Sequence, residues 1–286
     1  SYAVTPRRSP EGRTGPPPAA VRAGFPVALV SAPLAGATAP ASLVGTLVQV
    51  MAETLAGLTY VQLLRPGHPL LMGNLPLVAD LRTGNMIGGN AELALMNAAA
   101  AQLCHSYGLP IYNSCGLTES KIPDAQAGFE KGLTVAVTAL AGCEFNHHAS
   151  GMLESMLCVA YEQYVIDDDI NGTAMRLVKG IEVTEEALSL DVIDEVCRGE
   201  GHYLGHPQTL ELMNREYYYP HTADRRTRQD WEKDGSPDMR ELARRRARVV
   251  LRDHFPPGFP TVVDVQLRQA FAIALPPAVM RPGAYP

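Results

Sequence analysis

PIYNSC, residues Pro110–Cys115, is a short run that starts after the helix stop YGLP, begins with apolar residues and ends in polar ones. This pattern is typical of a buried strand that follows a helix. A helix is predicted next, over about Pro123–Leu140. The run is therefore the strand of a strand–loop–helix unit.

The same unit occurs three more times along the chain. The other predicted strands are PVALVSAP at Pro26–Pro33, PLLMGN at Pro69–Asn74 and CEFNHHA at Cys143–Ala149. The helices that follow them are predicted over about Pro40–Leu64, Asn90–Tyr107 and Leu153–Val178. Strands that alternate with helices indicate the α/β class with a parallel sheet. No GxGxxG follows the first strand, which disfavours a dinucleotide-binding fold.

Three regions are predicted. Residues 1–25 form an irregular N-terminal segment, in which Tyr2–Thr5 can be a short strand and RRSPEGRTGPPPAA is a loop, a linker or the remnant of a helix. Residues 26–180 hold the four units, and residues 181–286 form a helical extension and tail. Helices are expected from Thr184, from Gln208 or Thr209, and over Asp238–Asp253, with an irregular tail after His254.

Composition narrows the functional classes. The formal net charge of −6 gives no indication of a nucleic-acid partner. The one basic cluster fits a solvated helix face and comprises Arg240, Arg244, Arg245, Arg246 and Arg248. Five widely spaced cysteines and the lack of a signal peptide favour reduced thiols in a cytoplasmic protein.

The stretch Ser42–Leu64 is the most membrane-like part of the chain. It carries Glu53, and a charge at a bilayer centre costs about 2.5–3.5 kcal/mol on insertion scales. Polar residues also recur at helical spacing, so that they form a polar stripe on one side of the predicted helix: Ser42, Thr46, Gln49, Glu53 and Tyr60. We therefore predict a mostly buried helix of a soluble protein with a narrow solvated face, and no membrane partner.

Polar residues gather where the predicted strands end, which is the edge at which parallel sheets place chemistry. Asn74 and Asn113 are two of them, and His147 with His148 ends the fourth strand. Strand alternation predicts that only one of these two histidines points inward. That histidine could exchange a proton or ligate a metal, or it could be a hydrogen-bonded core residue.

The loop Thr118–Gln126 concentrates carboxylates, hydroxyls and the ammonium of Lys121 after the third strand. One interpretation is helix capping, with Pro123 at the first helical position, Asp124 at the positive helix end and a local Lys121 ion pair. The other is a site for a cation, which favours carboxylates and aromatic faces. Glu119, Tyr112 and Glu154 are the candidates for that site.

Three further motifs have structural interpretations. Asp80 and Arg82, two residues apart, favour a loop brace over an anion site. His202 and His206 resemble an H-x3-H metal pair but lack nearby cysteines or a third ligand, so a docking surface or a capping turn is favoured over zinc. The run Tyr217–Tyr219 is expected to be a packing or interface cluster.

Taken together and in order, several segments resemble the trimethylamine:corrinoid methyltransferase family. This family includes pyrrolysine-containing trimethylamine enzymes and pyrrolysine-free relatives such as glycine betaine methyltransferase. The resemblance runs from about Ala23 to Phe255. It rests on SAPLAGATAPASLVGTLVQVMAETLAG, ADLRTGNMIGG, GLTESKIPDAQAGFEKGLT, FNHHASGMLES, KGIEVTEEALSLDVIDEV, and GHYLGHPQTLELM with DRRTRQDWEKDGS.

The resemblance implies a fold and an activity. The fold would be a (β/α)8 TIM barrel with an all-helical C-terminal extension, of which this chain holds the C-terminal half of the barrel. The activity would be transfer of a methyl group from a methylated amine to Co(I) of a corrinoid (cobalamin) carried by a partner protein, with no metal bound by the chain itself.

The resemblance also implies site residues. The family's strand-end histidine corresponds to His148, and the Glu of its G-x-L-E segment corresponds to Glu154. Its T-D-S-K loop corresponds to Thr118–Lys121, with Glu119 replacing the Asp. The expected catalytic residues are thus His148, Glu119 and Glu154. The expected substrate-binding residues are Tyr112, Asn113, Thr118, Lys121, Asn74 and His147.

Two departures from the family pattern refine this expectation. No pyrrolysine occurs in the chain, which favours a quaternary amine as substrate, since quaternary nitrogen is already a good leaving group. The family's N-terminal barrel strands are missing, so a homo-oligomer or association with the missing barrel half is expected. The alternatives are a degenerate, non-catalytic relative and a module that only binds the corrinoid protein.

Overall fold

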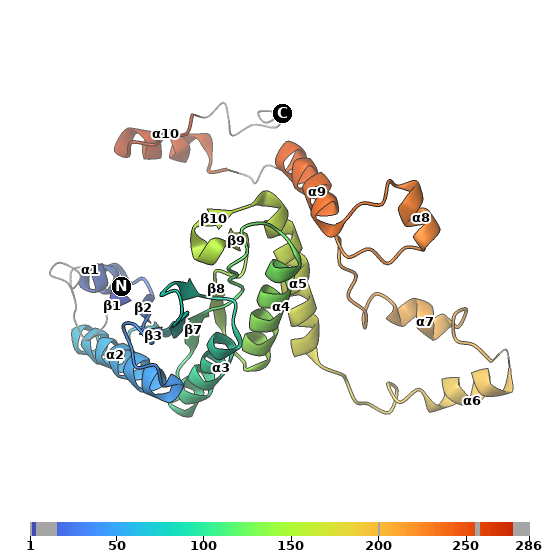
Figure 1. Cartoon of the computed structure of the whole chain (residues 1–286), viewed down its shortest axis with the longest axis horizontal. Helices are drawn as coiled ribbons and strands as arrows, with labels where there is room; N and C mark the ends of the chain where they lie inside the picture. Colours follow the sequence, from blue (N-terminus) through green and yellow to red (C-terminus); the bar gives the residue numbers. More distant parts are fainter. Residues whose placement is uncertain (1, 4–15, 200, 255–257, 277–286) are drawn as a thin grey trace.

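A five-stranded parallel sheet lies at the centre of the structure, in the order β1-β2-β4-β7-β8 (Figure 1). The computed structural model describes residues 2–3, 16–199, 201–254 and 258–276. The strands are β1 Tyr2–Ala3, β2 Val27–Ser31, β4 Leu70–Asn74, β7 Ile111–Ser114 and β8 Phe145–His147. The predictions of an α/β fold and of a strand within Tyr2–Thr5 are confirmed.

Helices follow the strands in chain order: α1 Pro16–Ala23, α2 Leu43–Leu64, α3 Ala91–Ser106, α4 Ala125–Leu140 and α5 Tyr161–Lys179. Each packs against the next, and α2 and α3 cover one face of the sheet. Buried Met72 and Ile111 point to this face and pack with Val50, Met96 and Cys104. This layer is the main hydrophobic core.

The opposite face of the sheet carries alternate residues of the same strands. Val30, Leu75 and Tyr112 form a separate buried cluster there, with Ala28 and Leu71 packed against it. The order of strands along the sheet follows the order along the chain. A doubly wound sheet reverses this order at a switch point, whereas a barrel does not.

A second, small sheet continues the chain beyond the carboxyl ends of β2 and β4. It contains β3 Leu34–Ala35, β5 Leu77–Ala79 and β6 Met86–Ile87, in the order β3-β5-β6. The Leu75 N–H donates to the Ser31 carbonyl oxygen, and the Leu77 N–H donates to the Pro33 carbonyl oxygen. The pairing of the two chain segments therefore continues from the main sheet into the small one. The loops at this edge are therefore held by backbone bonds.

Side-chain caps start three of the helices that follow the strands of the main sheet. Ser42, Asn90 and Asp124 accept from main-chain N–H groups three residues on, at the start of α2, α3 and α4. The capping interpretation of Asp124 is thus confirmed. Pro123 precedes the cap, so its predicted first helical position is wrong by two residues.

Two other regions refine the predictions. Pro16–Ala23 is a helix, which among a loop, a linker and the remnant of a helix fits the third interpretation, because prolines are tolerated in a first helical turn. The helix expected from Leu153 begins only at Tyr161. The intervening residues form the hairpin of β9 Met152–Leu153 and β10 Cys158–Val159 around a short turn over Glu154–Met156.

The prediction that α2 is mostly buried is wrong. Only six of its 22 residues are buried, and Val44, Val48 and Leu63 are largely exposed. Part of the polar stripe turns inward instead, where Glu53 accepts from the Ser31 hydroxyl and Thr46 is fully buried. Among the described residues, α2 is the one helix long and apolar enough to span a membrane, and the absence of a membrane partner stays a prediction.

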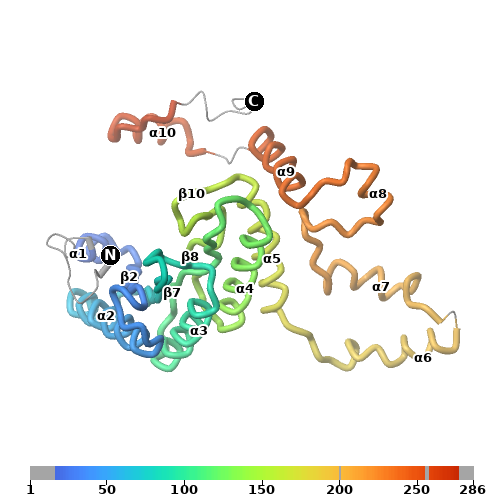
Figure 2. Tube along the Cα trace, in the orientation of Figure 1, coloured from blue at the N-terminus to red at the C-terminus, as the bar shows by residue number. Residues whose placement is uncertain are grey.

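The helical extension forms an arm beside the sheet layer (Figure 2). Its helices are α6 Leu190–Arg198, α7 Pro207–Leu212, α8 Arg228–Lys233, α9 Met239–Asp253 and α10 Thr261–Ala270. The chain turns at Thr184 and starts a helix only after Ser189, and α10 occupies part of the tail expected to be irregular. The last ten residues lie outside the described ones, and the boundaries 25/26 and 180/181 stay predictions.

Buried Asp169 fixes the return of the arm to α5. Its carboxylate accepts from the main-chain N–H groups of His221 and Thr222, from the Thr222 hydroxyl and from the Tyr218 hydroxyl. Tyr218 also lies against Gly172 of the same helix. Tyr218 therefore serves in packing, as one interpretation of the tyrosine run expected, whereas Tyr217 and Tyr219 are exposed.

Gly73 is predicted to be irreplaceable in the sheet. A Cβ there would lie 2.3 Å from the Leu29 carbonyl oxygen and 2.7 Å from the Val30 Cα. Gly73→Ala should lower the free energy of unfolding by about 1–3 kcal/mol, as overpacking does. Gly132→Ala in α4, where a Cβ meets nothing within 4 Å, should raise it by about 0.5–1 kcal/mol. Urea denaturation measures both, and a Gly73→Ala variant as stable as the unmodified chain would contradict the prediction.

Candidate functional site

An aromatic cluster lies along the adjacent strands β7 and β8 and reaches the carboxyl end of β8 at His147. Tyr112 pairs in register with Phe145, and their rings stack with centroids 5.2 Å apart and an interplanar angle of 15°. The Tyr112 hydroxyl is hydrogen-bonded to Nδ1 of His147, on the same face of the sheet. Phe145 remains 50 % exposed, so the cluster presents an aromatic surface.

His148 joins this cluster through an unusual backbone conformation. Its φ is 67°, a left-handed value that a non-glycine residue seldom adopts. Nδ1 of His148 lies 2.8 Å from the Ser114 hydroxyl oxygen, and its ring stacks on His147 with centroids 3.5 Å apart. The expectation that only one histidine points inward is wrong, because this turn ends the strand alternation at His147.

Both histidines favour the neutral ring. Burial lowers the pKa of His147, and burial together with the neighbouring His147 lowers the pKa of His148 from 6.5 to about 4. A positive charge on one ring would oppose protonation of the other, since the two are stacked. The pair is therefore suited to contacting a cation and poorly suited to donating protons at neutral pH.

A cavity of about 520 Å³ opens beside this cluster, between β8, α4 and α5. Its lining includes Phe145, His147, His148, Met152, Asn171 and Met175. Its volume is within the range of small-molecule sites in proteins.

The loop after β7 is organised by two carboxylates. Glu119 accepts from the main-chain N–H groups of Gly88 and Gly89, at 2.6 and 3.2 Å, and from the Ser155 hydroxyl at 2.9 Å. Glu130 accepts from the Thr118 hydroxyl and from the Glu119 N–H. Thr118 and Glu119 are thus brought together, in a clamp that joins three loops.

The remaining loop candidates lie around this clamp. Lys121 donates to the Glu119 main-chain carbonyl oxygen at 2.7 Å, so the ion pair expected for it is not what the structure shows. Glu154, Ser155 and Met156 all have left-handed φ values, of 47°, 51° and 82°. Main-chain bonds from Glu154 to Ser120 and from Ser155 to Thr118 hold this strained turn.

Asn74 and Asn113 lie on the other face of the sheet. The Asn74 amide donates to the sulfurs of Met51 and Cys104 and accepts from Thr54 on α2. Asn113 donates to the sulfur of Cys143. The structure therefore does not bring these two expected substrate-binding residues to the aromatic cluster, and we do not include them in the site.

Two of the secondary motifs have the structural roles that the sequence favours. Arg82 donates from its backbone and its guanidinium to Asp80, which braces the loop and holds the pKa of Asp80 at about 2. His206 caps α7 by accepting from the Gln208 N–H. Among the described residues, no group of three or more His, Cys, Asp or Glu side chains could hold a metal ion.

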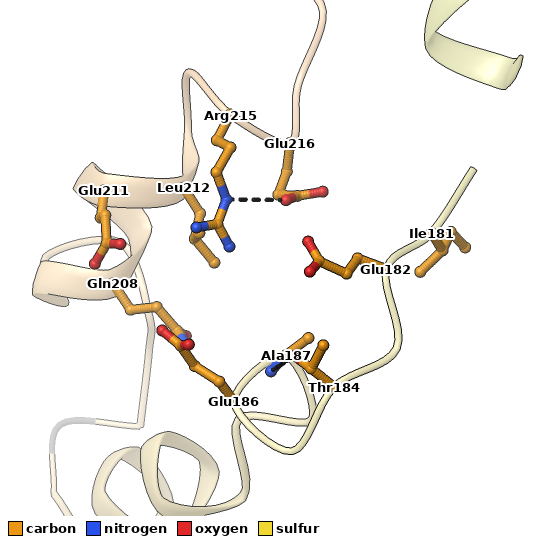
Figure 3. A pocket seen from close by; sticks show the side chains of 10 residues that line it. All are labelled: Ile181, Glu182, Thr184, Glu186, Ala187, Gln208, Glu211, Leu212, Arg215 and Glu216. Atoms are coloured by element: carbon orange, nitrogen blue, oxygen red, sulfur yellow. Dashed lines mark hydrogen bonds and ion pairs between the residues drawn. The ribbon is translucent and has the colours of Figure 1, made fainter. Parts of the chain in front are cut away.

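A second cavity, of about 450 Å³, lies in the arm between the turn after α5 and helix α7 (Figure 3). Four carboxylates surround it: Glu182, Glu186, Glu211 and Glu216. Arg215 and Arg176 pair with Glu216. These partly exposed ion pairs brace the arm, and none of the expected site residues lines this cavity.

Comparison with known sequences decides the family. The profile of the family described as trimethylamine methyltransferase (MTTB) matches residues 3–274. The chain belongs to this family. It is 36 % identical over 268 residues to the glycine betaine methyltransferase of Desulfitobacterium hafniense strain Y51, covering 94 % of this chain and 55 % of the relative. It is 38 % identical over 236 residues to the trimethylamine methyltransferase MttB of Methanosarcina thermophila, covering 82 % of this chain and 48 % of the relative.

The chain thus spans about half the length of the curated relatives it matches. The family resemblance inferred from the ordered motifs is confirmed.

Several contacts of the site could not be predicted from the sequence. Ser114 bonds to His148, Ser155 to Glu119, and Phe145 stacks on Tyr112. Strand-end position is the only signal for Ser114, and Phe145 could have been found only from the register of β7 and β8.

The lowered pKa of His148 predicts acid sensitivity. Between pH 6.5 and about 4 the unfolded chain binds a proton at this residue that the folded chain does not, so stability falls as pH falls through this window. His148→Gln should lose less stability than the unmodified chain between about pH 7 and about pH 4.5. Urea denaturation at both pH values measures the difference. His105→Gln, which removes a histidine bonded to Glu144 outside the cluster, should retain the His148 contribution; equal losses in all three proteins would contradict the assignment.

Proposed function

We propose that the chain is the C-terminal half of a TIM-barrel methyltransferase that moves a methyl group from a quaternary amine to the Co(I) of a corrinoid carried by a partner protein. The observation that carries this proposal is the cluster of Tyr112 and Phe145, paired across adjacent parallel strands, with two stacked histidines of lowered pKa at the carboxyl end of β8. Family membership supplies the class of reaction.

The aromatic faces support a cationic substrate. A quaternary ammonium has no N–H to donate, so it is recognised by aromatic faces and by nearby negative charge. Phe145, which stacks on the buried Tyr112 and is 50 % exposed, offers such a face, and the half-buried carboxylate of Glu154 follows in the next turn. The neutral His147 and His148 add aromatic surface without repelling the cation.

The protonation state of the histidines favours a quaternary amine over a tertiary one. Methyl transfer breaks a C–N bond whose electron pair stays on nitrogen, while the methyl carbon bonds to a nucleophile. A tertiary amine needs a proton on nitrogen before it leaves, and a His148 with a pKa of about 4 holds little proton at neutral pH. A quaternary nitrogen needs none. The Co(I) corrinoid, when its carrier binds, supplies the nucleophile.

The sheet supports a barrel that is completed by further chain. Helices α2 and α3 pack on one face, the strand order does not reverse, and β1 and β8 are the sheet edges. Exposed edges of this kind are normally paired or covered. The remaining length of the relatives is the segment we expect to pair with β8 and β1, whether from a separate polypeptide or the rest of a longer one.

The activity test uses the chain alone and the chain mixed with a polypeptide that covers the other half of a relative. Each is incubated with Co(I) corrinoid protein and with glycine betaine, tetramethylammonium or trimethylamine, and methyl–cobalt formation is followed by absorbance. We expect transfer from a quaternary amine, faster in the mixture. No transfer in either case would leave the degenerate relative or the corrinoid-protein-binding module as the better description.

Variants locate the site. His148→Asn and Tyr112→Phe should each lower kcat/KM by about 10²-fold, since misplacement of a bound group by about 1 Å costs that much. His105→Asn, on α3 and bonded to Glu144, is the matched control and should keep the full rate. Equal rates for His148→Asn and the control would remove His148 from the site.

A further inference from the structure

A buried ion pair between Lys131 of α4 and Asp167 of α5 lies beneath the two loops of the proposed site. The side chains are 0 % and 1 % exposed, and Nζ lies 2.9 Å from Oδ2. We propose that this pair is a positioning device that holds the turns after β7 and β8 together and thereby sets the geometry of the His147–His148 pair. The inference rests on the proposed function only in assigning these histidines to an amine site.

The contacts of the pair reach both turns directly. Lys131 Nζ donates to the main-chain carbonyl oxygen of Gly116 at 2.6 Å. Asp167 Oδ2 accepts from the main-chain N–H of Gly151 at 2.6 Å. Gly116 lies two residues after β7, and Gly151 lies three residues after His148. The exits of two neighbouring strands are thus tied to one ammonium–carboxylate contact.

The two turns also touch and leave little room to move. Gly116 and Gly151 have φ values of 70° and 79°, which side chains seldom tolerate. A Cβ on Gly116 would lie 2.8 Å from the Ala149 Cα, and one on Gly151 would lie 2.3 Å from the Tyr164 ring. Because Ala149 follows His148 directly, a shift of the Gly116 turn would move the histidine turn as well.

Burial makes each charge dependent on the other. Burial lowers the pKa of Lys131 and raises that of Asp167, while each partner's charge acts in the opposite direction. Apolar residues of similar volume often stabilise a core as well as a buried ion pair does. What apolar residues cannot replace is the pair of bonds to the Gly116 carbonyl and the Gly151 N–H, so we assign the pair a geometric role.

The test is the double variant Lys131→Met/Asp167→Leu, which removes both charges and both main-chain bonds and fills the site with apolar side chains. Ring-labelled histidine is titrated by NMR in the full chain, and His147 and His148 are assigned by substitution. The midpoint of His148 should rise from about 4 toward 6.5 in the double variant, because loss of the fixed turn exposes the ring. A purely stabilising pair would leave this midpoint unchanged in the folded protein, and that result would overturn the proposal.

The control is Arg244→Met/Glu162→Gln, which removes another ion pair of α5, at 3.0 Å, that binds neither turn. Its histidine midpoints should match those of the unmodified chain. If Lys131→Met/Asp167→Leu does not fold, Lys131→Met/Asp167→Asn is titrated instead, because its amide can still accept from Gly151 and can donate to the buried Gln163 Oε1, for which the described residues offer no partner. The bond to Gly116 is lost in this variant too, so the His148 midpoint should still rise. Loss of folding in both would assign the pair to stability and overturn the proposal.

A kinetic measurement separates this inference from the proposed function. In an assembly that transfers methyl groups, the double variant should lower kcat/KM for glycine betaine about 10-fold. An unmodified chain that transfers nothing while the midpoint shifts would contradict the function and keep the positioning role. Methyl transfer by the unmodified chain, together with an unchanged His148 midpoint in the double variant, would support the function and contradict the positioning role.

Discussion

Main-chain hydrogen bonding between parallel strands is the constraint on which the structure depends. Val27–Ser31 pairs along its whole length with Leu70–Asn74, and β7 and β8 extend the same ladder. Parallel pairing requires a crossover after each strand, so every strand ends at the same edge of the sheet. The loops after β7 and β8 therefore meet, and the Lys131–Asp167 contact and the stacked histidines are possible only because they do.

Sequence periodicity could predict the parts of the fold that depend on local physics. Helices α3 and α4 begin after the caps Asn90 and Asp124 and end near the expected breakers. It failed for α2, where burial depends on which face meets the sheet: Glu53 turns inward to Ser31, while Val44 and Val48 are left exposed. A side chain's polarity gives its preference for water and does not identify its partner.

The site was predictable in position and only partly in composition. Polar residues at strand ends indicated the correct edge, yet Asn74 and Asn113 bind sulfur atoms on the helix side. Successive residues of a strand point to opposite faces, so Asn113 lies on the other face from its neighbour Tyr112. Which face each residue occupies could be assigned only once the strand boundaries were known. His148 reaches the cluster through a left-handed turn that alternation cannot foresee, because the turn lies just beyond the strand, beside the close contact between Gly116 and Ala149.

The aromatic surface and the sheet edge at β8 are the same place, and this has a consequence for binding. Phe145 belongs to the edge strand and is half-exposed. A cation on an exposed aromatic face gains about 0.5–1 kcal/mol, and about 2 kcal/mol or more when water is excluded. Chain that pairs with β8 would remove water from the cluster as it completes the ladder. Under the proposed function, completion of the sheet and affinity for an ammonium ion would therefore be coupled, and each would strengthen the other.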